Sequence, residues 1–184
     1  MVNNSADQIP QEDVKRWLET DMWTAIPEPT LTTLLSSPPF ITIPGILNFR
    51  DLSLTTPSYI QPGLLFRSGA LDPSLPPAST AVLQDSLGIK LILDLRSDRE
   101  VARAPDPQIP GIENLWMKTE REPTPIQLEK YMGNGKGGYV QEYEQILEIY
   151  TGSIREALRW VRDAKGPMLF HCSGAFQPKL AIPF

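Results

Sequence analysis

The clearest hydrophobic pattern lies in residues 79–95, where a helical pattern gives way to a strand pattern. Ser79 can cap a helix, and Gly88 ends it. The apolar residues of this helix recur at helical spacing: Val82, Leu83 and Leu87. The run "KLILDL" follows at 90–95, and such a continuous apolar run is typical of a strand buried on both faces. This order predicts an α/β fold, with a mostly parallel central sheet flanked by helices.

A second pair of this kind lies near the end of the chain. The segment "SIREALRWVRDAK" predicts a helix that opens with a capping box of Ser153 and Glu156. Its apolar residues predict a stripe that faces the core: Ile154, Ala157, Leu158 and Val161. Gly166–Pro167 ends this helix, and "MLFHC" at 168–172 predicts the next buried strand.

Weaker patterns complete the predicted body, which begins near Phe40. Residues 40–52, "FITIPGILNFRDL", predict a strand, a Pro-Gly turn and a polar segment. Short strands are expected at 64–67 and 112–117.

Two more segments precede the last helix. The Gly- and Asn-containing residues 133–138 predict a loop, and "YVQEYEQILEIY" at 139–150 predicts a helix that breaks at Thr151–Gly152. The chain shows no internal repeat.

Residues 1–39 are interpreted as a peripheral extension. A short helix is expected at 11–20, followed by a proline-punctuated connector at 26–40. Trp17 and Trp23 are interpreted as docking this arm on the body.

Composition and charge exclude several classes of function. The 184 residues carry a net charge of −5, with a pI near 4.9 and no run of Lys or Arg, which argues against a nucleic-acid partner. No apolar stretch approaches the ~20 residues of a membrane span, and the N-terminus lacks the pattern of a signal peptide. The single cysteine excludes an intramolecular disulfide and fits a reducing compartment. We therefore expect a cytoplasmic protein.

The chain's only histidine and only cysteine stand side by side, as His171–Cys172, at the end of the last predicted strand. One His and one Cys do not supply the four ligands of a structural zinc site, so no metal is expected. In an α/β sheet, ligands bind beyond the carboxyl ends of the strands, which is where Cys172 falls. A loop of backbone N–H groups there would activate the thiol and bind phosphate. The pattern predicts attack of a thiolate on phosphorus, which needs no metal or organic cofactor.

Four further residues are candidates for the same site. Asp94 ends the strand "LILD" and would face the same crevice, either as a substitute acid or as a structural partner of Arg96 or of a loop amide. Arg50 and Asp51, together with Arg67, could line a phosphate pocket, or could belong to an internal ion-pair network that fixes these loops. Arg96 and Glu100 are interpreted as a clamp between strand and loop.

Four stretches in order resemble one family: "PGILNFRDL" (44–52), "PGLLFRSGAL" (62–71), "LGIKLILDLRSDRE" (87–100) and "PMLFHCS" (167–173). They are similar to the microbial tyrosine/lipid phosphatase family of the cysteine-dependent protein tyrosine phosphatase class. The resemblance divides the chain into an extension at 1–39, a phosphatase-like domain at 40–173 and an aberrant tail at 174–184.

The resemblance implies roles around the family signature H-C-x5-R. Cys172 would be the nucleophile that forms a phosphocysteine intermediate, while His171 would hold the cysteine loop by hydrogen bonds. The site residues taken to bind substrate are Ser173, Gly174, Arg50, Arg67 and Asp94. The implied substrate is a phosphotyrosine protein, with phosphoserine, phosphothreonine or phosphoinositides as further choices. In the family the Arg grips two phosphate oxygens, and the Asp before it is implied as the general acid.

The chain departs from the signature after Ser173. Pro178 stands at the Arg position, Phe176 and Gln177 stand at the Lys and Asp positions, and Gly174 and Ala175 reverse the usual order. Pro178 disfavours a helix there, so the fold is expected to be incomplete at its C-terminus. Because each lost donor to the developing oxyanion costs ~10²–10³ in rate, we expect turnover at or near background.

Three hypotheses about this chain stay open. In the first, the natural product differs beyond residue 173 because of splicing or reading frame, which sequencing of the transcript would decide. In the second, the chain is a non-catalytic module that binds phosphate or phosphopeptide. In the third, it is a fragment that does not fold stably, which a cooperative melt would refute.

Overall fold

The structure is a computed structural model, and it describes residues 25–54, 58–122, 124–125, 127–131 and 136–173. Its strands are β1 (Arg50–Asp51), β2 (Leu65–Ser68), β3 (Leu91–Asp94), β4 (Glu113–Trp116) and β5 (Met168–His171). Its α-helices are α2 (Glu28–Leu35), α3 (Pro77–Ala81), α4 (Asp98–Arg103), α5 (Lys136–Ile149) and α6 (Thr151–Arg162). A π-helical turn, η2 (Val82–Ser86), continues α3, and two 3₁₀ turns are η1 (Leu52–Leu54) and η3 (Leu128–Tyr131).

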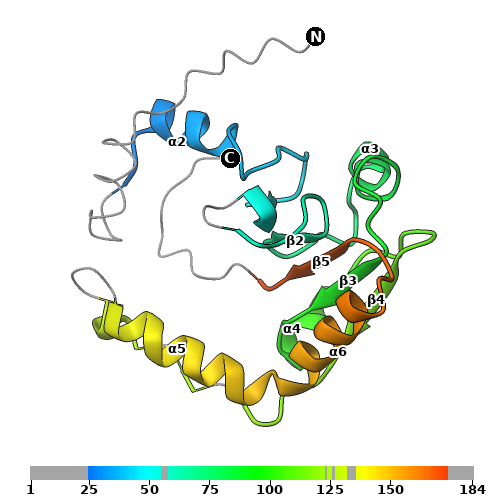
Figure 1. Cartoon of the computed structure of the whole chain (residues 1–184). Helices are drawn as coiled ribbons and strands as arrows, with labels where there is room; N and C mark the ends of the chain where they lie inside the picture. Colours follow the sequence, from blue (N-terminus) through cyan, green and yellow to red (C-terminus); the bar gives the residue numbers. More distant parts are fainter. Residues whose placement is uncertain (1–24, 55–57, 123, 126, 132–135, 174–184) are drawn as a thin grey trace.

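The five strands form one sheet in the order β1-β2-β5-β3-β4 (Figure 1). β2, β5, β3 and β4 run parallel, and β1 is antiparallel to β2. This arrangement confirms the predicted α/β fold with a mostly parallel sheet. Because the register pairs both Ser68 and Asp94 with His171, the three residues lie level at the carboxyl edge of the sheet.

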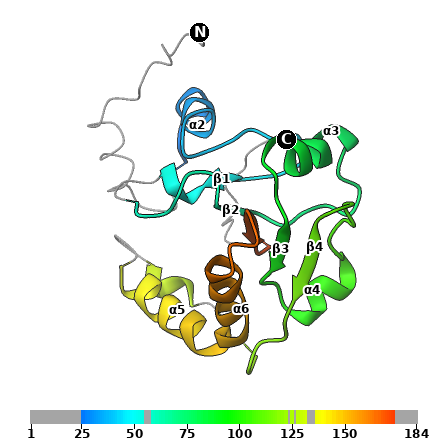
Figure 2. The same cartoon turned by 45° about the vertical axis from the view of Figure 1, so that its right-hand side comes forward.

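Side-chain alternation along the strands divides the core between the two faces of the sheet. One face carries Phe66, Ile92 and Leu169, which pack in a cluster with Leu83 of η2. The other face carries a second cluster, built on Leu91, Leu93 and Met168, against which Ala157 and Trp160 of α6 pack. Helices therefore cover both faces, with α3 and α6 on different sides of the strands (Figure 2).

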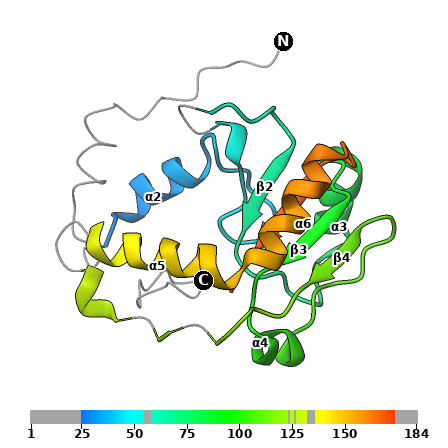
Figure 3. The same ribbon diagram turned by 60° about the horizontal axis from the view of Figure 1, so that its bottom comes forward.

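The helix α5 extends from the start of α6 away from the sheet (Figures 1 and 3). Its last residue, Ile149, is buried and accepts a hydrogen bond from the backbone N–H of Glu120. Tyr143 and Leu147 on the same helix are largely exposed. The C-terminal end of α5 is thus the part that is anchored in the core.

The predicted strands agree with the structure to within about two residues at β2, β3, β4 and β5. The expected strand near Phe40 is reduced to single bridges, Phe40 with Arg50 and Ile43 with Ile46. The Pro-Gly turn is present between the latter two, with Gly45 at a φ of 76°. Because the turn pairs residues that are only three apart in the chain, Ile43 and Ile46 form a single bridge and not an extended ladder.

Two expectations about the helices α2 and α3 are wrong. Residues 28–35 form α2 and not a connector, with Pro residues at the first turn, where a missing N–H costs nothing. Ser79 lies inside α3 and does not cap it, because Pro77 begins that helix. The Ser79 hydroxyl instead donates a hydrogen bond of 2.6 Å to the Pro44 carbonyl. Gly88 ends the helical segment as predicted, at a φ of 63°.

The predicted stripe on α6 is also wrong in part. Leu158 is 66% exposed and Val161 is 36% exposed, whereas Trp160 packs on the sheet. The helix begins at Thr151, so Ser153 is buried within it and forms no capping box. The face that meets the sheet is set by the large ring of Trp160, whose Nε1 donates to the Gly166 carbonyl.

Other expectations fall at or beyond the limits of the described chain. The start of α5 at Lys136 makes Gly137 and Gly138 helical, so the predicted loop at 133–138 is wrong there. Residues 133–135, the helix expected at 11–20, Trp17 and Trp23 lie outside the described residues. Within the described part of the chain, no helix is both long and apolar enough to span a membrane.

Candidate active site

Cys172 directly follows β5, the central strand of the sheet, at its carboxyl end. It is a free, half-buried thiol. Arg67, on the neighbouring strand β2, directs its Nη2 to the sulfur at 3.1 Å. The Arg67 guanidinium also lies over the Phe170 ring, 5.4 Å from the ring centroid, which holds it beside the thiol.

Arg50 brings a second guanidinium to this region from the edge strand. It lies opposite Arg67 in the antiparallel register of β1 and β2, and its Nη1 donates to the Asn48 carbonyl at 3.0 Å. Burial, together with the charge of Arg67, lowers the pKa of Arg50, while negative charge on Cys172 and Tyr143 acts in the opposite direction. Three of the predicted site residues, Cys172, Arg67 and Arg50, are therefore neighbours.

Asp51, next to Arg50, does not join an ion-pair network with these arginines. Its two carboxylate oxygens accept hydrogen bonds from the backbone N–H groups of Ser53 and Gly63, each at 2.9 Å. The side chain is buried and ties the two loops that follow β1 and precede β2. Asp51 therefore stabilises the wall from which Arg50 and Arg67 project.

Asp94 lies on the other face of the sheet, in a buried ion-pair cluster with Arg96 and Asp106. The Arg96 guanidinium donates to both oxygens of Asp94 through Nε and Nη2, at 2.7–3.0 Å. Nη2 also donates to Asp106 Oδ1 at 2.7 Å. Asp94 is 3% exposed, so its position matches the structural interpretation, in which it is the partner of Arg96.

The charges of this cluster act on Arg96 in opposing ways. Burial lowers the pKa of Arg96, but the hydrogen bonds and charge of Asp94, with the charge of Asp106, raise it on balance. The expected clamp between Arg96 and Glu100 is replaced by these two aspartates, with Glu100 contributing only a longer-range charge. The guanidinium is thus held as a permanent cation between two carboxylates.

His171 completes the cluster from β5. Its ring is fully buried, and Nε2 lies 2.8 Å from Asp106 Oδ2 and 3.8 Å from Asp94 Oδ1. Nδ1 is buried and has no hydrogen-bond partner among the described residues. Sequence reasoning missed Asp106. The available signal was its place between Pro105 and Pro107, which restrict the backbone on both sides of a lone carboxylate.

Ser173 and Glu100 form a third contact near the thiol. Burial raises the pKa of Glu100, but hydrogen bonds from Ser173 and Ser97 and the charge of Arg96 lower it on balance. The Ser97 hydroxyl and backbone N–H both donate to the Glu100 carboxylate, at 2.6 Å and 3.1 Å. The first residue after Cys172 is thereby connected to the start of α4.

Tyr150, at the junction of α5 and α6, was not identified from the sequence. Burial raises its pKa, and negative charge on Cys172 and Glu100 adds to the effect. Its phenol is therefore one of the polar groups near the thiol. Nothing in the local sequence distinguished it from the other tyrosines of this helical region.

The remaining predicted residues lie outside the described chain. These are Gly174 and the positions that depart from the signature, Phe176, Gln177 and Pro178. No geometry is therefore assigned to the segment after Ser173.

A metal site could be imagined at Asp94, Asp106 and His171, whose ligand atoms all lie within 4.8 Å of one another. The Arg96 guanidinium already donates to both carboxylates. A divalent cation there would have to displace a buried cation that is well hydrogen-bonded. The residues fit an ion-pair cluster better than a metal centre.

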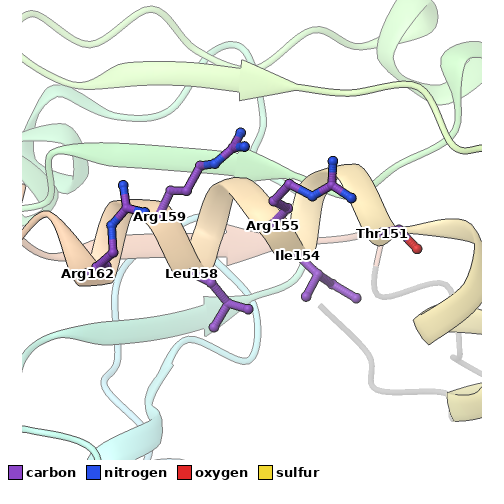
Figure 4. Close-up of a pocket in the computed structure, with 6 residues that line it drawn as sticks. All are labelled: Thr151, Ile154, Arg155, Leu158, Arg159 and Arg162. Atoms are coloured by element: carbon purple, nitrogen blue, oxygen red, sulfur yellow. The ribbon is translucent and has the colours of Figure 1, made fainter.

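A cavity of about 430 Å³ lies on α6 and not at Cys172. Its walls include Ile154, Leu158 and Arg155, and Figure 4 shows the two apolar side chains projecting from one side of the helix. A smaller hollow of about 300 Å³ lies along α5 and includes Arg121 and Glu148. Neither hollow is lined by a predicted site residue, so neither is part of the candidate site at Cys172.

Comparison with known proteins is consistent with this arrangement. Residues 41–174 match the model of the tyrosine phosphatase family. A segment of 68 residues, 37% of the chain, is 46% identical to the triple specificity protein phosphatase PtpB of Mycobacterium tuberculosis. That match covers 24% of the relative, so the shared segment is about a quarter of its length.

Proposed function

The chain belongs to the tyrosine phosphatase family, and from this premise we propose that residues 40–173 carry a phosphoester site with Cys172 as its nucleophile. One observation carries the proposal: the Arg67 Nη2 lies 3.1 Å from the Cys172 sulfur, at the carboxyl end of the central strand. A guanidinium in this place stabilises negative charge on sulfur and attracts a phosphate dianion. The tyrosine phosphatase reaction requires both properties of one site.

The chemistry proposed for the intact family is nucleophilic displacement at phosphorus. The Cys172 thiolate would form the S–P bond as the P–O bond to the alcohol or phenol breaks, and the leaving oxygen would take up a proton. Water would then attack the phosphocysteine, break the S–P bond and release inorganic phosphate. The sequence of steps uses no metal ion or organic cofactor.

The substrate class is a phosphorylated protein, with phosphotyrosine as the first choice. The half-buried thiol beside two guanidiniums is accessible to a phosphate dianion carried on a protein side chain. The relative is a triple specificity protein phosphatase. Phosphoserine, phosphothreonine and phosphoinositides are therefore the second choices for this site. The lone free thiol also leads us to propose a reducing, cytoplasmic location.

Turnover by this chain is proposed to be at or near background. Pro178 replaces the Arg that grips the phosphate in the family signature, and Gln177 replaces the implied acid. Arg67 and Arg50 approach from strands and not from the loop, so they supply charge without the bidentate fork of the signature. A second candidate function, a non-catalytic module that binds phosphate, is favoured by the same two arginines.

Two measurements on one set of variants test the proposal. Hydrolysis of para-nitrophenyl phosphate is compared with heat of binding for a phosphotyrosine peptide, using the wild type, Cys172→Ser and Arg67→Met. Arg121→Met, which removes an exposed arginine that pairs with Glu148, is the matched control.

We expect hydrolysis near background in all four proteins. We also expect heat of binding that Arg67→Met removes and Arg121→Met preserves. No heat with the wild type would contradict the phosphoester site. Hydrolysis by the wild type that Cys172→Ser abolishes would show the thiol at work and would contradict the inactive state.

A further inference from the structure

The histidine beside the nucleophile has two ring nitrogens in unlike surroundings. Nε2 lies 2.8 Å from the Asp106 carboxylate, and Nδ1 is buried without a partner among the described residues. We propose that Asp106 is a positioning residue, which fixes His171 as the Nε2–H tautomer and so reserves Nδ1 as an acceptor beside Cys172. The inference rests on the proposed function only in taking Cys172 as the nucleophile.

The tautomer follows from what each neighbour can donate or accept. A carboxylate that is ion-paired with Arg96 carries no proton, so Asp106 can only accept from the ring. Nε2 must therefore carry the hydrogen. A second proton on Nδ1 would create a buried N–H without an acceptor, and such orphaned donors are rarer in proteins than unsatisfied acceptors.

The charged groups around the ring, among the described residues, are two carboxylates and one guanidinium. Asp94 of β3 lies 3.8 Å from Nε2, and Asp106 lies in the segment between α4 and β4. Arg96 hydrogen-bonds to both carboxylates and offsets one of the two negative charges. Both ion pairs of the ring thus involve Nε2, and no described residue forms an ion pair with Nδ1.

The position of Nδ1 explains how Asp106 could influence the thiol without touching it. Nδ1 is bonded to the ring carbon nearest the backbone of His171, which continues directly into Cys172. Without a proton, Nδ1 leaves no unpaired donor inside the protein. As a donor it would need an acceptor that no described residue supplies, and the resulting strain would shift Cys172 relative to the Arg67 guanidinium.

An isosteric substitution of Asp106 should invert the tautomer of the His171 ring. In Asp106→Asn, Arg96 Nη2 still requires an acceptor, because a guanidinium has only donors. The amide oxygen must face Arg96, which leaves the amide NH₂ facing Nε2. Nε2 must then accept, and the ring proton moves to Nδ1.

The matched control is Asp94→Asn. It removes a carboxylate of equal size from the same buried cluster and also weakens a pair with Arg96. It leaves the 2.8 Å contact of Asp106 with Nε2 in place. A change caused only by damage to the cluster would appear in both variants.

The chain is suited to a direct measurement because it contains one histidine and one cysteine. Two-bond ¹H–¹⁵N correlation spectra of a tag-free, ¹⁵N-histidine-labelled protein at pH 8 report the tautomer of His171 alone. We expect Nε2–H in the wild type and in Asp94→Asn, and Nδ1–H in Asp106→Asn. A wild-type ring that is Nδ1–H or doubly protonated would overturn the proposal, even if the variant does not fold. A folded Asp106→Asn that keeps Nε2–H would overturn it as well.

The effect on the thiol is read from alkylation of Cys172 by iodoacetamide at pH 7. We expect Asp106→Asn to slow alkylation about twofold to tenfold, because the shift of Cys172 weakens its contact with Arg67 by up to the net contribution of one hydrogen bond. Asp94→Asn should slow it less. Equal or faster alkylation in Asp106→Asn would contradict the positioning role. Neither readout requires turnover, so a failure here is distinct from a failure of the phosphoester site.

Discussion

His171 and Cys172 are adjacent in sequence but lie in two very different regions. His171 faces a closed cluster, in which Arg96 and two aspartates satisfy one another within a largely buried space. Cys172 faces a more open region, where one guanidinium contacts the sulfur and the side chain remains half buried. His171 therefore belongs to a buried ion-pair cluster, and the next residue, Cys172, belongs to the more open region beside Arg67.

This contrast shows how a single strand serves two purposes. Alternation along β5 sends neighbouring side chains to opposite faces, so the network can be buried while the thiol stays accessible. The buried side fixes where the strand ends. The open side gains its chemistry from that fixed position, because Arg67 is held beside the sulfur by the same sheet.

The largest effect is expected on the buried side, from Arg96→Met. The change leaves Asp94 and Asp106 buried without their cation, and breaking a buried pair in this way costs about 3–5 kcal/mol. Urea denaturation followed by circular dichroism measures the loss in unfolding free energy. The control is Arg121→Met, whose exposed pair with Glu148 is expected to contribute no more than about 1 kcal/mol. Equal losses in the two variants would show that the cluster is not the stabilising region.

A smaller effect is expected on the open side, from Arg67→Met. Removing the guanidinium at 3.1 Å from the sulfur should slow iodoacetamide alkylation of Cys172 about tenfold, which corresponds to ~1.4 kcal/mol. Arg67→Lys keeps the positive charge and should recover part of the rate. Stability should change less than in Arg96→Met. A rate that is the same in the wild type and Arg67→Met would remove Arg67 from the site.

The smallest effect is expected where the two regions meet, at Glu100. Its pKa is held below the ordinary 4.5 in the folded chain, chiefly through hydrogen bonds from Ser173 and Ser97 that outweigh burial. A lowered folded pKa stabilises the protein above pH 4.5, and this contribution disappears as the pH falls through the folded value. Glu100→Gln should therefore lower the unfolding free energy at pH 6, and the difference from the wild type should shrink below pH 4.5.

Urea unfolding of the wild type and Glu100→Gln between pH 3 and pH 6 checks this prediction. Glu148→Gln, at an exposed position on α5, serves as the control. A gap between the wild type and Glu100→Gln that stays constant, or widens as the pH falls, would contradict the assignment.

Local patterns predicted the elements that depend on their own residues. The run "LILD" became β3, the segment before Cys172 became β5, and Gly88 ended its helix. A strand buried on both faces must be apolar throughout, so its sequence alone reveals it. The outward turn of Leu158 was not predictable in this way, because the face that a helix buries depends on which side of it meets the sheet.

The features of the candidate site also divide into those that the sequence predicts and those that depend on the fold. The residues alone were enough to place a cysteine after a buried strand and to show that the chain departs from the family signature after Ser173, at Pro178. The partners that His171 and Cys172 contact became visible only in the folded chain. Asp106 is 65 residues from His171, and Arg67 is 105 residues from Cys172. Contacts between residues so far apart in the chain arise from strand order and register, which no local pattern encodes.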